Sequence, residues 1–259
     1  MALMTRRDGA VPRGARARAR LTAERLARVH PARSELEFGS AYELLVVTIL
    51  SAQSTNRLAN QIGASLFARY PDPAALAEAK LEDVEDIVRQ IGFYRTKART
   101  VVAAARAVAE RHGGAVPGTM TELLTIPGVG RKSANVVLGL AFGAPSIVAD
   151  RHAMRLAHRL RMVSEAEPGR VEAQLGRLLP RPEWRAFSLR MTLHGRHVCL
   201  ARRPLCERCV LNDICPSSST RAWPAEARLA LSLSLLADAE PDAGPAEAAP
   251  STRETAREA

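Results

Sequence analysis

The sequence predicts an all-α protein, and two observations support this fold class. Apolar residues recur with the helical period through almost the whole segment between the two ends of the chain. No stretch shows the alternation of apolar and polar residues that marks a half-buried strand, and no internal repeat indicates a solenoid. With 259 residues and 47% apolar content, the chain can bury one large core or two smaller ones.

The predicted helices can be justified one by one along the chain. Residues 42–50 are apolar on nearly all sides, as expected for a central buried helix. The helical pattern continues through residues 66–87, with an interruption at Pro71-Asp72-Pro73, and returns at residues 101–109 after Gly92. Each of these segments is therefore expected to be a helix that contributes an apolar face to a core.

The two ends of the chain are expected to remain unpacked. Residues 1–20 alternate Arg and Ala with Gly and Pro and offer no apolar face, so we predict a disordered basic arm. Residues 217–259 are rich in Ala, Glu and Pro and are predicted to form a second disordered tail. Within that tail, residues 229–236 could form a short helix.

The charge balance narrows the class of partner. A net charge of +10 and a pI of about 10.4 favour a polyanion, with nucleic acid and an anionic membrane surface as the candidates. No apolar run is long enough to span a bilayer, so we expect a soluble intracellular protein, with no membrane among its partners. We expect a cytoplasmic, nucleoid-associated protein of bacterial type, with a mitochondrial presequence in the Arg-rich start as the less favoured alternative.

Residues 119–143 predict a helix, a hairpin and a second helix. The hairpin is Pro127-Gly128-Val129-Gly130, in which the proline ends the first helix and the glycines permit tight backbone near a ligand. Amide groups there and at Arg131, where the next helix starts, can bind a phosphate without reading sequence. The alternative is a plain turn between two helices.

Lys132 and Asp150 are the candidate catalytic residues. The chain has only three lysines, and Lys132 lies in the first turn of the helix after the hairpin. Unlike arginine, lysine can lose its proton, so its amine can attack a sugar C1′ and form a Schiff base. Asp150 precedes a helical pattern at residues 153–160, where it can cap the helix, assist the lysine as a carboxylate, or do both.

Four cysteines with the spacing C-x6-C-x2-C-x5-C indicate one ligand set rather than scattered core residues. Disulfides are disfavoured inside a cell, whereas four thiolates suit either zinc or an iron-sulfur cluster. Arg202 and Arg203 make the same loop basic, which suits contact with a phosphate backbone as well as plain solvation. The ligand set is Cys199, Cys206, Cys209 and Cys215.

Together these motifs resemble the endonuclease III family. Residues 124–138 (LTIPGVGRKSANVVL) look like its helix-hairpin-helix, and Ala149-Asp150-Arg151-His152 and the cysteine spacing also fit. The resemblance covers about residues 21–216. It implies two helical domains with a DNA groove between them: a central barrel at residues 34–144, and a cluster domain built from residues 21–33 and 145–216.

The resemblance also implies an activity. Members of the family remove oxidised pyrimidines from duplex DNA by flipping the nucleotide out and attacking C1′, and they cleave the strand by β-elimination. Lys132 would be the nucleophile, Asp150 its acidic partner, and a 4Fe-4S cluster would be held by the four cysteines. The implied partner is double-stranded DNA with a damaged base or an abasic site, bound by a monomer.

Two further loops resemble those of the family, and two other residues differ from the family's pattern. Gln53 looks like the glutamine that fills the vacated base stack, and Phe93 stands where a second inserting loop usually has leucine. Asn56 replaces a common aspartate, which would remove a carboxylate near the pocket. Arg151 replaces a threonine and could pair with Asp150.

Two other functions remain as alternatives. An adenine-mismatch glycosylase shares the fold, the aspartate and the cluster, but lacks the hairpin lysine and carries an extra domain. A noncatalytic DNA-binding iron-sulfur module is the alternative from a different class. Lys132 and Asp150 favour the enzyme that forms a Schiff base.

Overall fold

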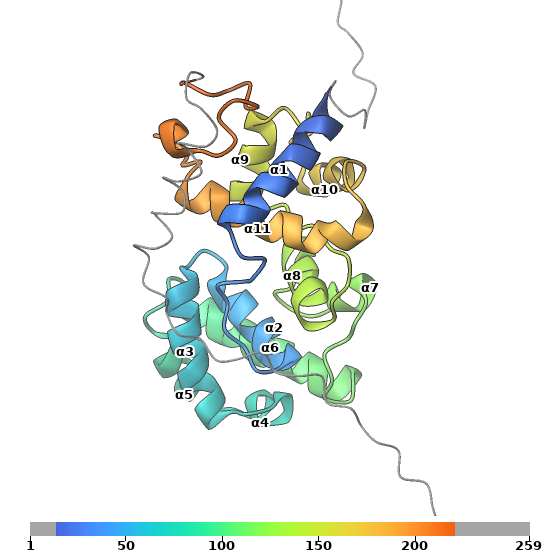
Figure 1. The fold of residues 1–259 in the computed structure, drawn as a ribbon. Helices are drawn as coiled ribbons and strands as arrows, with labels where there is room; N and C mark the ends of the chain where they lie inside the picture. Colours follow the sequence, from blue (N-terminus) through green and yellow to red (C-terminus); the bar gives the residue numbers. More distant parts are fainter. Residues whose placement is uncertain (1–13, 221–259) are drawn as a thin grey trace, which may run out of the picture.

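The computed structural model describes residues 14–220, and this part of the chain is helical without a strand, which confirms the predicted fold class (Figure 1). The helices are α1 (Ala15–Val29), α2 (Ala41–Ser51), α3 (Asn56–Arg69), α4 (Pro73–Ala77), α5 (Leu81–Val88), α6 (Tyr94–Arg111), α7 (Met120–Leu123), α8 (Arg131–Ala141), α9 (Arg151–Arg159), α10 (Pro168–Gly176) and α11 (Trp184–His197). Two single 3-10 turns occur at Arg181–Glu183 and Cys206–Arg208. None of the described helices is long and apolar enough to cross a membrane.

The first core surrounds α2, as the sequence predicts. Leu44 to Leu50 are all buried, so α2 is covered on every side, with α3, α6 and α8 packed against it. The start of α2 is fixed by Ser40, whose Oγ accepts a hydrogen bond from the Glu43 backbone N–H. This core takes its buried side chains from residues 42–138.

The second core joins the beginning of the described chain to its end. Figure 1 shows α1 beside α9, α10 and α11, and the buried side chains of this core come from residues 15–29 and 147–211. The chain therefore leaves the second core after α1, builds the first core, and returns. The domain division predicted at residues 34–144 stays a prediction, and the two cores lie on either side of its boundaries.

The predicted disordered arm is wrong for residues 15–20, which form the start of α1. Ala15 and Ala19 are buried one helical turn apart, because small side chains give this helix a narrow apolar stripe. The two arginines between them are also anchored: Arg18 Nε donates to the Leu160 carbonyl at 2.6 Å, and the exposed Arg16 donates to the Arg177 carbonyl at 3.1 Å. Residues 1–13 lie outside the described part of the chain.

The predicted disordered tail is also wrong for residues 217–220. Ser217 Oγ donates to the Arg159 carbonyl at 2.9 Å, and Asn212 Nδ2 donates to Thr220 Oγ1 at 3.3 Å. These hydrogen bonds tie residues 217–220 to the second core, so they are not a disordered segment. The helix considered at residues 229–236 falls in residues 221–259, outside the described part.

Candidate functional site

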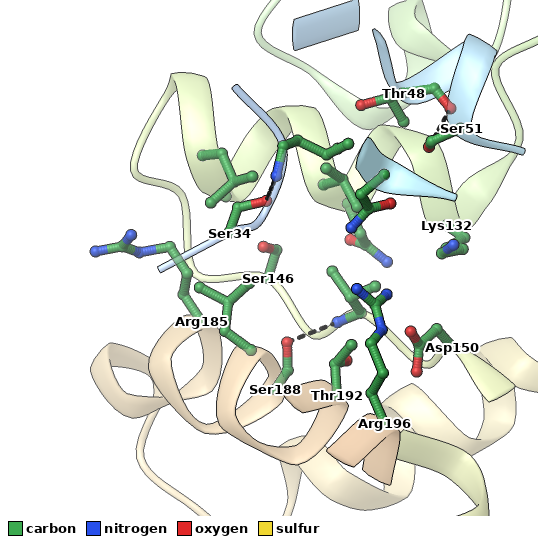
Figure 2. A pocket seen from close by; sticks show the side chains of 18 residues that line it. Ser34, Thr48, Ser51, Lys132, Ser146, Asp150, Arg185, Ser188, Thr192 and Arg196 are labelled. Atoms are coloured by element: carbon green, nitrogen blue, oxygen red, sulfur yellow. Dashed lines mark hydrogen bonds between the residues drawn. The ribbon is translucent and has the colours of Figure 1, made fainter. Parts of the chain in front are cut away.

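One pocket, with both polar and apolar walls, takes its lining from both cores. Lys132 at the start of α8 and Asp150 just before α9 both contribute to it, and Figure 2 shows them on the same side of the pocket. The sequence separates these two residues, and the fold brings them together. Other polar side chains on the walls are Ser34, Thr48, Ser51, Asn56, Asn135, Ser146, Arg185, Ser188, Thr192 and Arg196.

Asp150 is held by its own helix. Its Oδ1 accepts hydrogen bonds from the backbone N–H groups of His152 at 2.9 Å and Ala153 at 2.8 Å, so Asp150 is the N-cap of α9. Both bonds end on Oδ1, which leaves Oδ2 able to accept from a ligand in the pocket. A Cβ on Gly195 would lie 2.6 Å from the His152 carbonyl oxygen, so this glycine lets α11 pack directly against the start of α9. The cap and the carboxylate chemistry can therefore coexist at Asp150.

The pairing considered for Arg151 with Asp150 is not what the structure has. Arg151 Nε donates to His152 Nε2 at 3.3 Å, and no ion pair joins Arg151 to Asp150 within residues 14–220. The reason is geometric: the Asp150 carboxylate caps the helix and lines the pocket, whereas Arg151 begins the helix on its exposed side.

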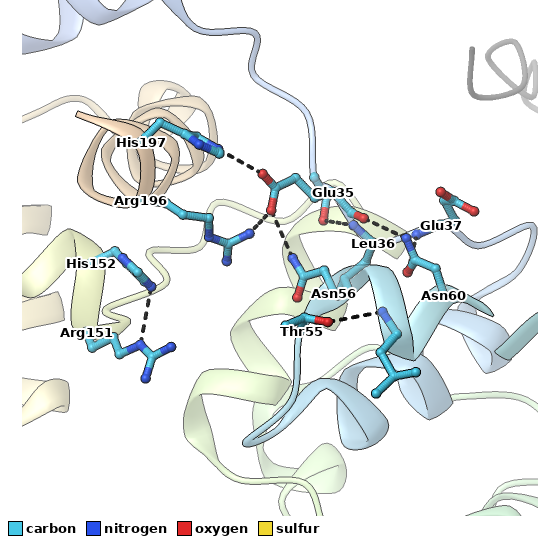
Figure 3. Close-up of polar contacts among 12 residues, drawn as sticks. Glu35, Leu36, Glu37, Thr55, Asn56, Asn60, Arg151, His152, Arg196 and His197 are labelled. Carbon is cyan, nitrogen blue, oxygen red and sulfur yellow. Dashed lines mark hydrogen bonds and ion pairs between the residues drawn. The ribbon is translucent and has the colours of Figure 1, made fainter. Parts of the chain in front are cut away.

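Asn56, which lines the pocket, is hydrogen-bonded to the Glu35 carboxylate. Figure 3 shows the Glu35 carboxylate between three partners: it accepts from Asn56 Nδ2 at 3.2 Å, lies 3.2 Å from His197 Nε2, and forms an ion pair with Arg196. An aspartate at position 56 would instead bring a second negative charge against Glu35. Asn56 therefore complements Glu35, whereas the carboxylate that lines the pocket itself is that of Asp150. Sequence reasoning missed Glu35 because its partners lie on two distant helices.

The hairpin before Lys132 requires glycine at one of its two glycine positions. Gly128 has φ +80°, and a Cβ there would lie 2.3 Å from Thr100 Cγ2 on α6. Gly130 has φ −92° and no atom within 4 Å of such a Cβ. Contacts within the protein therefore require glycine at position 128. A side chain at position 130 would meet open space.

Replacing Gly128 with alanine is expected to lower the free energy of unfolding by about 1–3 kcal/mol, because it adds backbone strain and a steric clash. Gly130→Ala is the matched control, since its Cβ meets no protein atom. Thermal unfolding of both variants checks this expectation. Equal melting temperatures for the two variants would contradict it.

Arg131 does not extend freely from the hairpin. Its Nε donates to Glu172 Oε2 at 2.6 Å, which links the start of α8 to α10 in the second core. Burial raises the pKa of the Glu172 carboxyl, and the Arg131 guanidinium opposes that rise. The Arg131 side chain is still 55% exposed, so the same guanidinium can also face a phosphate.

Gln53 and Phe93 lie beside each other in the fold. Both line one open pocket between the end of α2 and the start of α6, and the Phe93 ring is exposed. Both are non-glycine residues with positive φ, 63° for Gln53 and 61° for Phe93, a conformation that costs about 1–3 kcal/mol each. Strained residues of this kind often occur where the backbone must present a side chain outward.

The four cysteines are all free and line a single pocket under the C-terminal loop, as expected for one ligand set. No three His, Cys, Asp or Glu side chains among the described residues form a site for a single metal ion. Burial raises the pKa of Cys209 to about 12 and also raises that of Cys215. Their thiolates therefore need a positive charge beside them, which the iron ions of a cluster supply.

Hydrogen-bond donors directed at sulfur support the same interpretation. Arg159 Nη1 donates to Cys199 Sγ at 3.1 Å, and the Leu211 backbone N–H donates to Cys209 Sγ at 3.4 Å. Arg159 also donates to the carbonyls of Leu200 and Ala201 and so anchors the loop. Sulfurs that accept hydrogen bonds are suited to carry the negative charge of an iron-bound cluster.

A buried histidine pair extends this set of donors. His194 Nε2 lies 3.2 Å from Cys209 Sγ, and His194 Nδ1 lies 3.0 Å from His30 Nε2. Burial lowers the pKa of His194 to about 3 and that of His30 to about 4, so both rings are neutral at pH 7. Because an iron-bound thiolate only accepts, His194 would donate to sulfur from Nε2 and accept from His30 at Nδ1. Nothing in the local sequence at His30 indicates this role.

Arg202 and Arg203 are exposed in the loop that the cysteines and Arg159 hold in place. A rigid loop with two free-standing cations suits contact with a phosphate backbone. The structure thus combines a pocket that holds a lysine and a carboxylate, a hairpin with exposed glycines, and a basic loop.

Comparison with known proteins identifies the family. Residues 46–181 match the HhH-GPD superfamily base excision DNA repair protein family, and residues 199–215 match the iron-sulfur binding domain of endonuclease III. Endonuclease III from Synechocystis sp. is 44% identical over 195 residues, which cover 74% of this chain and 89% of that protein. The chain belongs to the endonuclease III family.

Other members of the endonuclease III family agree. Endonuclease III from Escherichia coli strain K12 is 38% identical over 186 residues, covering 72% of this chain and 88% of that protein. A solved structure of a trapped endonuclease III-DNA covalent intermediate, an estranged-adenine complex, superposes with a TM-score of 0.75 at 36% identity. The superposition covers 78% of this chain and 96% of that one.

Family membership settles three predictions. The chain is a base-excision repair enzyme of the glycosylase and AP lyase class, DNA is its partner, and its four cysteines hold a 4Fe-4S cluster. The predicted glycosylase that also cleaves the strand is therefore favoured over the adenine-mismatch glycosylase and the noncatalytic DNA-binding module.

Proposed function

We propose that this chain releases oxidised pyrimidines from duplex DNA and cleaves the strand, with Lys132 as the nucleophile. The observation that carries the proposal is the convergence of Lys132 and Asp150 on one pocket. Because C1′ is inaccessible within stacked DNA, the damaged nucleotide would first rotate out of the helix and into this pocket. The carbonyl and N–H edges of an oxidised pyrimidine suit walls made of hydroxyl and amide side chains.

The reaction then follows from the chemistry of the two residues. The Lys132 amine attacks C1′ with its nitrogen lone pair, the glycosidic bond breaks, and its electron pair leaves with the base, which takes up a proton from water. Asp150, whose Oδ2 remains available, accepts a proton from the attacking amine and stabilises positive charge on the sugar. The sugar ring then opens: the C1′–O4′ bond breaks, O4′ takes up the proton held by Asp150, and the Schiff base forms between C1′ and the Lys132 nitrogen. The Schiff base acidifies C2′, and loss of that proton expels the 3′ phosphate by β-elimination.

Contacts to the DNA backbone would come from several elements of both cores. The exposed amides around Gly130, the Arg131 guanidinium, and the arginines of the cluster loop face phosphates without reading sequence. The 4Fe-4S cluster, when bound, holds the loop that carries Arg202 and Arg203. Gln53 and Phe93 would fill the space that the flipped nucleotide leaves. We further propose that the enzyme acts as a monomer, and its cytoplasmic location stays a prediction.

Product analysis on defined duplexes tests the proposed function. A duplex with one thymine glycol is expected to lose the base and to be cleaved with a β-elimination end, whereas the undamaged duplex stays intact. A duplex with adenine opposite guanine should not react. Adenine release without strand cleavage would contradict the proposal in favour of the adenine-mismatch alternative, and binding without any release would favour a noncatalytic module.

A further inference from the structure

Lys97 connects the two loops that carry Gln53 and Phe93. Its backbone N–H donates to the Phe93 carbonyl at 3.0 Å, and its Nζ donates to the Ile49 carbonyl at 2.6 Å. Phe93 immediately precedes α6, and Ile49 lies in the last turn of α2, four residues before Gln53. Lys97 therefore forms hydrogen bonds next to both the loop of Gln53 and the loop of Phe93.

The Ile49 carbonyl depends on such a partner. Carbonyls in the last turn of a helix lack the intrahelical donors that those further back have. Ala52 N–H also approaches the Ile49 oxygen, but at 3.4 Å, so the Lys97 amine is the shorter contact. The bond fixes the end of α2 against the first turn of α6 at the point from which both loops emerge.

The surroundings of Lys97 support a structural use of its amine. The side chain is partly buried, and burial lowers the pKa of its ammonium group. No carboxylate pairs with Lys97 anywhere in residues 14–220, so an ion pair does not account for its position. The amine lines the same pocket as Gln53 and Phe93, with Thr96, Thr100 and Gly128 around it.

The backbone at both loop residues must be held by its neighbours, since neither is a glycine and both have positive φ. Small changes in the spacing of two such loops would move both side chains relative to the DNA. We propose that Lys97 is a positioning residue of the repair reaction, which sets the separation of Gln53 and Phe93 and so controls how they replace a flipped nucleotide. This inference rests on the function proposed above.

The test compares Lys97→Met, which removes the donor at similar length, with Lys97→Arg, which keeps a donor and the charge. Lys80→Met is the matched control, because Lys80 is exposed at the start of α5 and its substitution removes the same charge. Single-turnover base release is measured on thymine glycol in a fully paired duplex and in a short unpaired bubble. The bubble has no base stack to fill, so it does not require insertion.

Lys97→Met is expected to slow base release from the paired duplex by about 10²-fold, the scale of an ångström-sized misplacement, and to leave the bubble rate nearly unchanged. Lys97→Arg should retain more of the duplex rate, and Lys80→Met should behave as wild type on both substrates. A second measurement places 2-aminopurine opposite a non-cleavable abasic analogue, where its change in fluorescence on binding should be smaller with Lys97→Met.

Equal losses on the duplex and the bubble would overturn the proposal, because they would indicate a general folding or charge effect. Unchanged rates on both substrates would overturn it as well. Failure of the proposed function gives a different result, since wild-type protein would then release no base from either substrate.

Discussion

Replacing Lys132 with alanine abolishes base release and strand cleavage on a thymine glycol duplex, while the affinity for that duplex changes little. The loss exceeds the roughly 10²–10⁴-fold that general acid–base catalysis supplies, because without an amine no Schiff base can form. Lys132 is exposed at the edge of the pocket, so alanine leaves no buried cavity and the fold persists. Single-turnover kinetics and duplex titration measure the two effects separately.

Lys80→Ala is the control for that experiment, since it removes an exposed lysine distant in sequence from the hairpin. It should retain the wild-type rate. Loss of duplex binding together with activity in Lys132→Ala would assign the lysine to the DNA interface or to folding, and would contradict its role as the nucleophile.

Asp150→Asn should slow base release by about 10²–10⁴-fold, the usual contribution of a positioned proton acceptor, without a loss of stability. Asparagine caps a helix as well as aspartate does, so the hydrogen bonds from His152 and Ala153 can be kept. The variant thus separates the negative charge from the cap. Rates are measured under single turnover, and stability by thermal unfolding.

Asp150→Ala removes both properties and completes the comparison. It should be as slow as Asp150→Asn and, in addition, lose about 0.5–2 kcal/mol of stability because the cap is gone. Unchanged chemistry in Asp150→Asn would remove the carboxylate from the mechanism and leave Asp150 as a cap alone.

Features with a local signal could be predicted from the sequence. The buried helix at residues 42–50 follows from its composition, and the hairpin follows from its proline and glycines. Lys132 is marked by the rarity of lysine in an arginine-rich chain, and the cysteines by their spacing. In each case the signal is carried by residue types and by their spacing along the chain, without reference to a distant partner.

Features that depend on distant partners could not be predicted in the same way. Glu35 joins α3 to α11, His30 reaches Cys209 through His194, and Lys97 bonds to the end of α2. No sequence pattern pairs such residues, because only the fold brings them together. The prediction of a disordered arm was wrong at residues 15–20 for a related reason. The arginines there donate hydrogen bonds to carbonyls far along the chain.

Borohydride trapping on a duplex with one abasic site tests the central claim, that the Lys132 amine forms a covalent bond to the sugar. Wild-type protein should give one stable adduct, peptide mapping should locate it at Lys132, and Lys132→Ala should give none. With only three lysines in the chain, the mapping is unambiguous. An adduct of equal yield in Lys132→Ala, or one that maps to Lys97 or Lys80, would contradict the account.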